Sequence, residues 1–156
     1  MTVRTSPAPA LEPMELEEHL FFLCTQVVYR RTRAMHEALA PLALLPTEYR
    51  VLSAVLRKGP LAMSELAAWT AYERTRLTHI LDAMEQKKWI VRTNADLDRR
   101  SVLVAIAPAG RRIFAKAKVL VDRITEVIMS ANSADEIAQV RSALRTMRGK
   151  LIEMGM

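Results

Sequence analysis

Residues 72 to 111 change from one hydrophobic period to another, and this change constrains the fold more than any other feature of the chain. From Thr75 to Lys87 apolar residues recur at steps of three and four, which predicts an amphipathic helix. From Trp89 to Val91 the helical period is lost, which predicts a β-strand. Positions 102, 104 and 106 alternate as its partner, with a charged turn over 94–101 between them. The segment therefore predicts a helix followed by a β-hairpin.

The two faces of the predicted helix differ in chemistry. We expect one face to enter a core through Leu77, Ile80, Leu81 and Met84. The opposite face of the first two turns holds side chains that can donate hydrogen bonds to phosphate oxygens or base edges, namely Arg74, Thr75, Arg76, Thr78 and His79. Because recognition helices contact bases with their N-terminal turns, this face predicts the DNA-reading helix of a winged helix-turn-helix.

The predicted hairpin turn is strongly charged. Asp96, Asp98, Arg99 and Arg100 cannot enter a core without partners, so we expect the turn to project. Arg99 and Arg100 would suit an adjacent minor groove, whose negative potential attracts guanidinium groups. We expect Asp98 to orient one of these arginines by a charge-assisted hydrogen bond and not to touch DNA itself. The alternative is an ordinary solvated hairpin.

Composition agrees with a nucleic-acid partner. The chain has 156 residues, a formal net charge of +6, and enough hydrophobic residues, 51%, to supply a core. Its one cysteine, Cys24, excludes an intrachain disulfide and favours a cytoplasmic location. No apolar run has the length of a signal or membrane segment, so we expect no membrane partner. Residues 1–13, rich in Pro, Ala and Thr, predict a disordered arm.

The remaining segments predict a mainly α fold with a small β-hairpin wing. Proline at the first turn and a break at the end predict helices over 14–39, 46–57 and from 108 to about 130, where Ala131, Asn132 and Ser133 interrupt the last of them. Gly59 permits a left-handed cap, 59–62 reads as a short strand, and 63–70 as a helix. Ser133 suits the N-cap of a final helix.

The first and last helices predict a homodimer. Their apolar stripes are remote from the DNA-reading segment and have little to bury against in a small monomer. The last helix repeats apolar residues at alternating steps of three and four, at Ile137, Val140, Leu144, Met147 and Leu151. We expect these helices to pair across a two-fold axis and to hold two recognition helices over pseudo-palindromic half-sites about 10 base pairs apart. The alternative is packing within one chain.

Six short blocks together resemble the MarR family of winged helix-turn-helix transcription regulators. They occur in the order and spacing of that family at residues 44–52, 59–61, 64–67, 74–78, 98–100 and 107–111. The resemblance implies a DNA-binding domain at 44–107, flanked by a helical dimerisation region at 14–43 and 108–156. It also implies transcription regulation, with repression through promoter blockage. Arg76 and His79 depart from the residues common in the family, which bears on the operator sequence.

The same resemblance implies an effector pocket where the dimerisation helices meet the winged domain. Aromatic carboxylates or phenolics are the usual ligands in such proteins. An arginine and a tyrosine one helical turn apart could hold a carboxylate and its ring. The candidates are Tyr29, Arg33, His36, Trp69 and Tyr72.

Other functions have weaker support in the sequence. No Ser/His/Asp arrangement or paired carboxylates stand out, and four glycines give no phosphate loop, so we expect no enzyme and no cofactor. Three histidines and one cysteine show no metal-ligand spacing, so we expect no metal site. Two alternatives stay open: an oxidant-sensing regulator using Cys24, and a nonspecific DNA-binding or protein-interaction module.

Overall fold

The computed structural model describes residues 15–95 and 98–155, and the side chains of 94–101 lie outside that description. The predicted N-terminal arm and Asp96 therefore also lie outside it. In chain order the elements are η1 (Leu16–Glu18), α1 (Leu20–Leu39), η2 (Ala40–Leu42), α2 (Pro46–Lys58), β1 (Leu61–Ala62), α3 (Met63–Thr70), α4 (Arg74–Gln86), β2 (Ile90–Ala95), β3 (Asp98–Ile106), α5 (Pro108–Met129) and α6 (Ala134–Glu153). This confirms the prediction of a mainly helical chain with a β-hairpin wing.

The hydrophobic core lies where α2, α3 and α4 pack against the small sheet. The predicted inner stripe of α4 is confirmed, because Leu77, Leu81 and Met84 are fully buried and Ile80 is half-buried. Residues from α2, α3 and β3 complete this core, among them Val51, Leu52, Val55, Leu66 and Val104. The core extends to α1 and α5 through Met35, Leu39, Phe114, Ala117 and Val121.

The sheet has three antiparallel strands in the order β1-β3-β2, so β3 lies in the middle. Ile90 pairs with Ile106 and Arg92 with Val104, and β1 adds Leu61 opposite Val104 on the other side. The expected turn over residues 94–101 was too long. β2 continues to Ala95 and β3 begins at Asp98, because the ladder extends past the apolar residues into the charged part of the hairpin.

The first long helix begins later than its sequence pattern predicts. A separate 3-10 turn, η1, is followed by His19 in extended backbone (φ −72°, ψ 119°), and α1 starts only at Leu20. The expected continuous helix from residue 14 was therefore wrong, because the extended backbone at His19 interrupts it. The apolar stripe that the first helix was expected to carry consists of Leu16, Leu20, Leu23 and Val27, and it is exposed along the surface of η1 and α1.

Most other helix boundaries agree with their sequence signals. Proline occupies the first turn of α2 and α5. Gly59 ends α2 as expected and with a positive φ of 84°, but its ψ of −164° differs from the left-handed cap that the sequence predicts. Ser133 caps α6, and its backbone N–H donates to the Glu136 side chain in a capping box. At Leu45, the N-cap of α2, the backbone N–H donates to the buried carboxylate of Glu48 at 2.8 Å.

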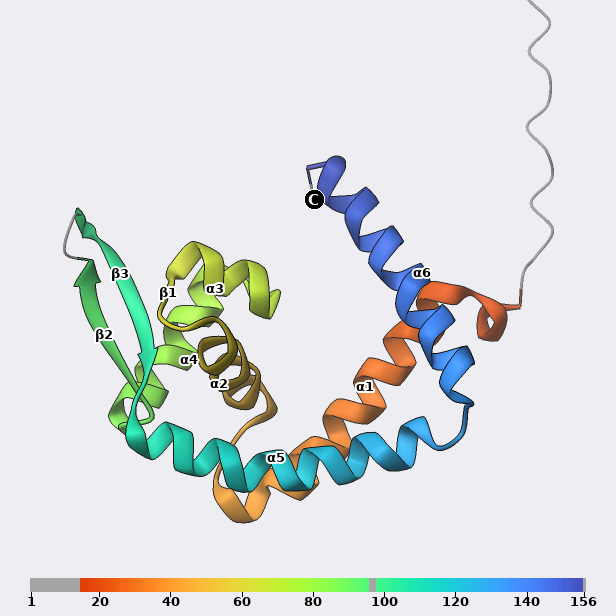
Figure 1. The fold of residues 1–156 in the computed structure, drawn as a ribbon, viewed down its shortest axis with the longest axis horizontal. Coiled ribbons are helices and arrows are strands. Elements are labelled where there is room, and N and C mark those ends of the chain that lie inside the picture. Colours follow the sequence, from red (N-terminus) through yellow and green to blue (C-terminus); the bar gives the residue numbers. More distant parts are fainter. Residues whose placement is uncertain (1–14, 96–97, 156) are drawn as a thin grey trace, which may run out of the picture.

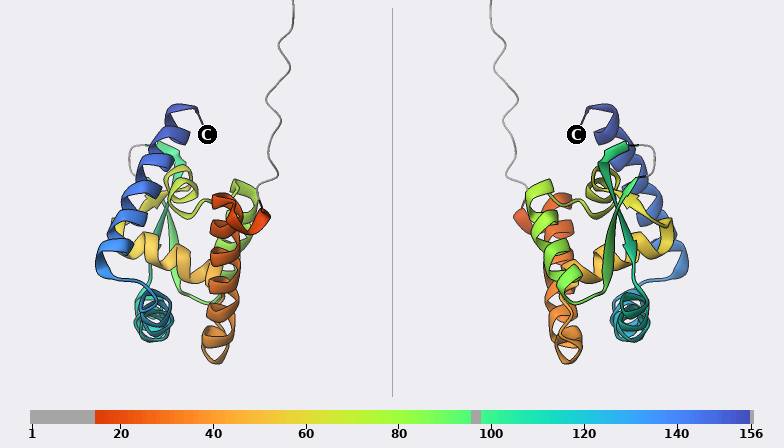
Figure 2. Two further views of the ribbon diagram at one scale, coloured as in Figure 1. Left: turned by 90° about the vertical axis from the view of Figure 1, so that its right-hand side faces the viewer. Right: turned by 90° about the vertical axis from the view of Figure 1, so that its left-hand side faces the viewer.

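The helices outside the core give the molecule an open, U-shaped outline (Figure 1). Helix α5 runs along the base, with α1 packed beside it, and α6 turns back at the far end. Figure 2 shows α1 and α6 on opposite sides of the molecule when it is viewed end-on. None of the residues of α6 is buried. Among the described residues no single helix has the length and apolarity to span a membrane, although α1 with η2 and α2 pass that test as a pair bent by 85°.

Gly110 forms the joint between the hairpin and α5. A Cβ placed on it would lie 2.0 Å from the carbonyl oxygen of Trp89, and that same oxygen accepts the Ala107 N–H at 2.9 Å. The backbone of α5 therefore approaches the start of β2 more closely than any side chain permits. Gly149 in α6, by contrast, has nothing within 4 Å of such a Cβ.

We predict that Gly110→Ala lowers the free energy of unfolding by about 2 kcal/mol or more, because backbone must shift to admit the methyl group. Gly149→Ala is the matched control and should raise it by up to about 1 kcal/mol through helix propensity. Urea unfolding of both variants, followed by circular dichroism, measures the difference. Equal stability of the two variants would contradict the close approach at Gly110.

Candidate nucleic-acid interface and ligand hollow

The exposed face of α4 gathers the polar residues that the sequence assigned to DNA. Burial of Leu77, Leu81 and Met84 turns the opposite side of the helix to solvent. The side chains of Arg74, Thr75, Arg76, Thr78 and His79 are all exposed there. The Thr78 hydroxyl donates to the Arg74 carbonyl at 3.0 Å, which fixes its rotamer and leaves its oxygen able to accept. This face can bind phosphates or base edges.

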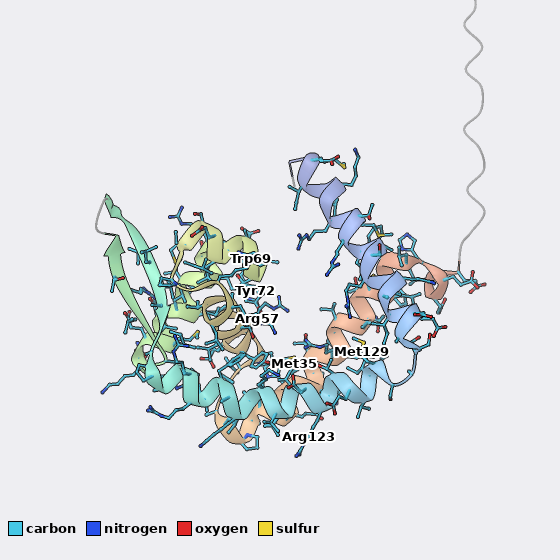
Figure 3. The ribbon with its side chains drawn as sticks, in the orientation of Figure 1. Met35, Arg57, Trp69, Tyr72, Arg123 and Met129 are labelled. Atoms are coloured by element: carbon cyan, nitrogen blue, oxygen red, sulfur yellow. The ribbon has the colours of Figure 1, made fainter. Side chains whose placement is uncertain are left out.

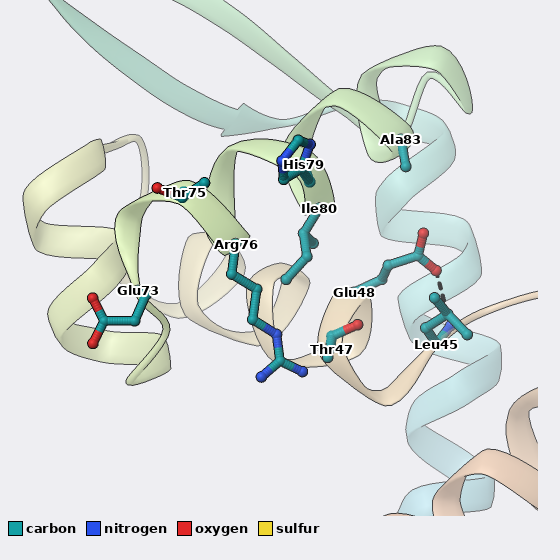
Figure 4. A pocket seen from close by; sticks show the side chains of 9 residues that line it. All are labelled: Leu45, Thr47, Glu48, Glu73, Thr75, Arg76, His79, Ile80 and Ala83. Carbon is teal, nitrogen blue, oxygen red and sulfur yellow. Dashed lines mark hydrogen bonds between the residues drawn. The ribbon is translucent and has the colours of Figure 1, made fainter.

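A shallow hollow of about 590 Å³ lies between this face and the start of α2 (Figure 4). Thr75, Arg76 and His79 line it from α4, and Leu45 and Thr47 line it from the α2 side. Figure 4 shows that Arg76 reaches from α4 toward Thr47 instead of extending away from the body of the protein. The guanidinium carbon of Arg76 lies 4.8 Å from the ring centroid of Tyr72, so Arg76 contacts the protein in the absence of DNA.

Two other cations near this face, Lys87 and Arg92, are occupied by ion pairs. The Lys87 ammonium lies 2.7 Å from the carboxylate of Glu48, and Arg92 lies 2.6 Å from Asp82. Glu48 is 1% exposed and Lys87 is exposed, and their ion pair links α2 to the end of α4. Within the described part of the chain, neither Arg74 nor Arg76 forms an ion pair. The available positive charge of α4 is thus concentrated in its first turn, where recognition helices contact DNA.

The wing residues are placed by their backbone alone. Asp98, Arg99 and Arg100 are the first three residues of β3, at the far end of the hairpin from the core. Their side chains lie outside the described residues, so the orienting role of Asp98 stays a prediction. The salt bridge of Arg92 to Asp82 joins β2 to α4, so the hairpin and the polar face form one unit.

A second hollow, of about 360 Å³, lies where α1, α2 and α5 meet. Three guanidinium groups line it, from Arg31 on α1 and from Arg50 and Arg57 on α2. One carboxylate, Asp122 of α5, also lines it, but its charge is offset by an ion pair with Lys118. The net positive charge predicts an anionic ligand.

The hollow also has an aromatic wall and neutral hydroxyls. Tyr49 stacks on Phe114, with ring centroids 5.1 Å apart, and burial raises the pKa of Tyr49 above its ordinary value. Ser53 and Thr125 add two more hydroxyl groups. This combination can take the ring and the charge of an aromatic acid.

The hollow continues along α2 toward α3. An adjoining hollow of about 450 Å³ shares Arg50, Ser53 and Arg57 with the first and adds Lys58 and Trp69. Trp69 is 51% exposed, and the Lys58 ammonium lies 4.2 Å from its ring centroid. Figure 3 shows Arg57 and Trp69 on the inner side of the U, facing the space between the winged domain and the helical arms. We refer to these two neighbouring hollows together as the groove, and cations line both of them.

The structure does not bring the five expected ligand residues together. Tyr29, Arg33 and His36 of α1 are exposed and do not line the groove, and Arg33 pairs with Glu37 on its own helix at 3.4 Å. The residues of α1 that face α2 are Arg31, Thr32 and Met35, which lie on a different face of the helix. Of the expected set, only Trp69 lines the groove.

The groove residues on α2 were missed, although their spacing was visible. Arg50, Ser53 and Arg57 recur at steps of three and four, which places them on one helical stripe opposite the buried Val51, Leu52 and Val55. This stripe of polar residues on a core helix was a signal for a binding face. Tyr72 lies outside both hollows but contacts Arg50, with 5.0 Å between the guanidinium carbon and the ring centroid.

Cys24 is half-buried in α1 and has no disulfide partner among the described residues. Within those residues no group of three or more His, Cys, Asp or Glu side chains could hold a metal ion.

Comparison with known proteins shows similarity to the MarR family. The family model described as the MarR family matches residues 44–101. The multiple antibiotic resistance protein MarR of Escherichia coli is 27% identical over 124 residues, covering 79% of this chain and 86% of that protein. A MarR variant from E. coli in complex with operator DNA superposes with a TM-score of 0.76 at 24% identity, covering 86% of this chain and 98% of that one.

A fourth likeness is to a ligand-bound protein. CouR from Rhodococcus jostii, bound to p-coumaroyl-CoA, gives a TM-score of 0.78 at 25% identity, covering 86% of this chain and 94% of that one. The polar α4 face, the three-stranded wing and these likenesses agree: the chain has a winged helix-turn-helix fold, its residues 44–101 match the model of the MarR family, and it is similar to MarR transcription regulators.

Proposed function

We propose that this regulator is a cytoplasmic homodimeric repressor that binds a pseudo-palindromic operator and is released by a small anionic ligand. The observation that carries the DNA-binding part is the exposed face of α4, whose first turn holds two arginines without ion pairs among the described residues. In this proposal residues 44–107 read DNA, and residues 14–43 and 108–156 dimerise. The operator complex of the E. coli MarR variant, which shares this fold, supports it.

The apolar surface of the outer helices supports the dimer. Val140, Leu144 and Leu151 of α6 are 59%, 45% and 47% exposed, and the apolar stripe of α1 is exposed as well. Surface of this kind on a small chain is a cost in water unless a partner covers it. A second copy, related by a two-fold axis, covers both stripes with one isologous interface.

The arginine-lined groove supports an acid in preference to a neutral phenol as the ligand. Arg31, Arg50 and Arg57 bring three positive charges to the first hollow, against a single carboxylate that is already paired with Lys118. An uncharged phenol would leave those charges unmatched. CouR is a precedent in this fold for binding a large anionic thioester, p-coumaroyl-CoA. We therefore propose aromatic carboxylates or their thioesters as the class of ligand.

Two alternatives follow from other features. An oxidant sensor would use Cys24, which is half-buried in α1 beside the exposed apolar stripe. A nonspecific DNA-binding or protein-interaction module would use the fold without reading sequence.

The test of the proposal is fluorescence anisotropy with DNA from upstream of the protein's own gene and with scrambled DNA, in the presence and absence of p-coumarate, p-coumaroyl-CoA or peroxide.

Tight binding to the upstream DNA alone, released by an acid or thioester, is the expected result. Release by peroxide that a Cys24→Ser variant abolishes would favour the oxidant sensor. Equal binding to both DNAs, unchanged by any addition, would favour the nonspecific module.

We predict that Arg99→Ala and Arg100→Ala weaken binding to every DNA and each reduce the slope of log affinity against log salt by about 1. Arg76→Ala and Thr78→Ala should in addition change base preference, with a loss of about 1–3 kcal/mol on the operator. Binding to a set of single-substitution operators at several salt concentrations separates the two effects. Equal losses on all DNAs for the helix variants would refute base reading by α4.

We predict that Leu144→Glu shifts the protein from dimer to monomer, because a carboxylate would be buried in the proposed interface without a partner. Ser142→Glu, two residues away and on a different face of α6, is the control and should remain dimeric. Light scattering coupled to size exclusion measures the mass of each variant. A dimeric Leu144→Glu protein would place the interface elsewhere.

We predict that Arg57→Met weakens binding of p-coumaroyl-CoA by about 10- to 100-fold, the range expected for losing one hydrogen bond to a charged group. Arg112→Met on the exposed surface of α5 removes the same charge away from the groove and should bind as the wild type does. Isothermal titration calorimetry measures both affinities. Unchanged binding by Arg57→Met would exclude the groove as the ligand site.

A further inference from the structure

Two arginines from different helices contact the same tyrosine ring. The guanidinium carbon of Arg50 on α2 lies 5.0 Å from the ring centroid of Tyr72, and that of Arg76 on α4 lies 4.8 Å from the same centroid. Both distances fall within the range of cation–π attraction. Tyr72 lies between the end of α3 and the start of α4, at the entrance to the recognition helix.

Arg50 belongs at once to the groove and to this cluster. It lines both hollows of the groove, and its Nη1 donates to the carbonyl of Thr70 at 3.1 Å. Thr70 is the last residue of α3 and is buried, so Arg50 fixes the short connection that leads through Tyr72 into α4. Ala71 within that connection is left-handed, with a φ of 54°, a conformation that a non-glycine residue keeps only when its surroundings hold it.

We propose that Arg50 and Tyr72 are positioning residues that couple the groove to DNA binding: Arg50 holds the Tyr72 ring, the ring holds Arg76 for DNA, and an anion that draws Arg50 into the groove loosens Arg76. This inference rests on the proposed function, because it assigns DNA to α4 and an anion to the groove. The effect is local. Only the Arg50 guanidinium has to move, from the Thr70 carbonyl and the Tyr72 ring to a carboxylate of the ligand in the groove. The carboxylate is the stronger partner because it is charged.

The chemistry predicts a penalty for DNA when the ligand is bound. A side chain that is held before binding does not have to be ordered during binding, and ordering one long side chain costs affinity. When Arg50 leaves, the connection at Thr70 loses its hydrogen bond and the Tyr72 ring loses one of its two cations. The DNA complex and the ligand complex therefore favour different positions of Arg50, which is the differential interaction that allosteric coupling requires.

A mutant cycle on DNA affinity tests the coupling without any ligand. Arg50→Met should weaken operator binding about fivefold, the size expected for the ordering of one side chain. In a Tyr72→Leu background, which itself binds more weakly, Arg50→Met should have no further effect. Tyr72→Phe retains a ring and should retain the effect of Arg50→Met. Lys116→Met, an exposed charge on α5, controls for the loss of one positive charge.

Equal losses by Arg50→Met with and without the Tyr72 ring would overturn the proposal, as would no loss in either background. Thermal unfolding of each variant establishes that it is folded. A second arm repeats the measurement with p-coumaroyl-CoA. Release of wild-type but not of Tyr72→Leu protein from the operator supports the coupling, and equal release of both overturns it. If p-coumaroyl-CoA fails to release the wild type, the proposed ligand is wrong, and the first arm still decides the coupling.

Discussion

The working surface of this protein depends on the burial of three side chains on one side of α4. Leu77, Leu81 and Met84 are removed completely from water, and each contributes on the order of 1.5–3 kcal/mol to the fold. A helix held in this way cannot rotate without exposing them. The arginines, threonines and histidine of the opposite side are therefore presented to solvent at a fixed angle. The buried Glu48 carboxylate, paired with Lys87 just past the end of α4, holds the same helix against α2.

Periodicity in the sequence predicted this part of the fold because local pattern and tertiary environment agree there. The α4 stripe, the proline starts of α2 and α5, the Ser133 cap and strand β3 all have local causes, and the structure has each of them. The start of α1 was mispredicted because its stripe is exposed and no packing extends the helix through His19. The hairpin turn was predicted too long because cross-strand hydrogen bonds are indifferent to side-chain polarity.

The two candidate sites also differ in how far local sequence pattern predicts them. The DNA-facing residues lie on one helix, so their shared face follows from spacing alone. The groove is built from four helices, α1, α2, α3 and α5, and which face of α1 meets α2 depends on a crossing that no local pattern encodes. Arg31 and Arg33 are equally good candidates in the sequence, yet only Arg31 lines the groove. The sequence does not reveal ion pairs either: the charges of Lys87 and Arg92 are paired with Glu48 and Asp82 within the protein.

The close contact of Gly110 with the Trp89 carbonyl joins the hairpin and α5 into one rigid unit, which acts as a lever with the wing at one end. Helix α5 has 22 residues, which at about 1.5 Å per residue is about 33 Å, close to one turn of B-form DNA. Because one end of this lever carries the wing and the other end leads to α6, its length sets how far the wing stands from the outer helices. Adding one residue would lengthen it by about 1.5 Å but rotate its ends by about 100°. Changes of length that preserve the orientation of the wing must therefore come in whole helical turns.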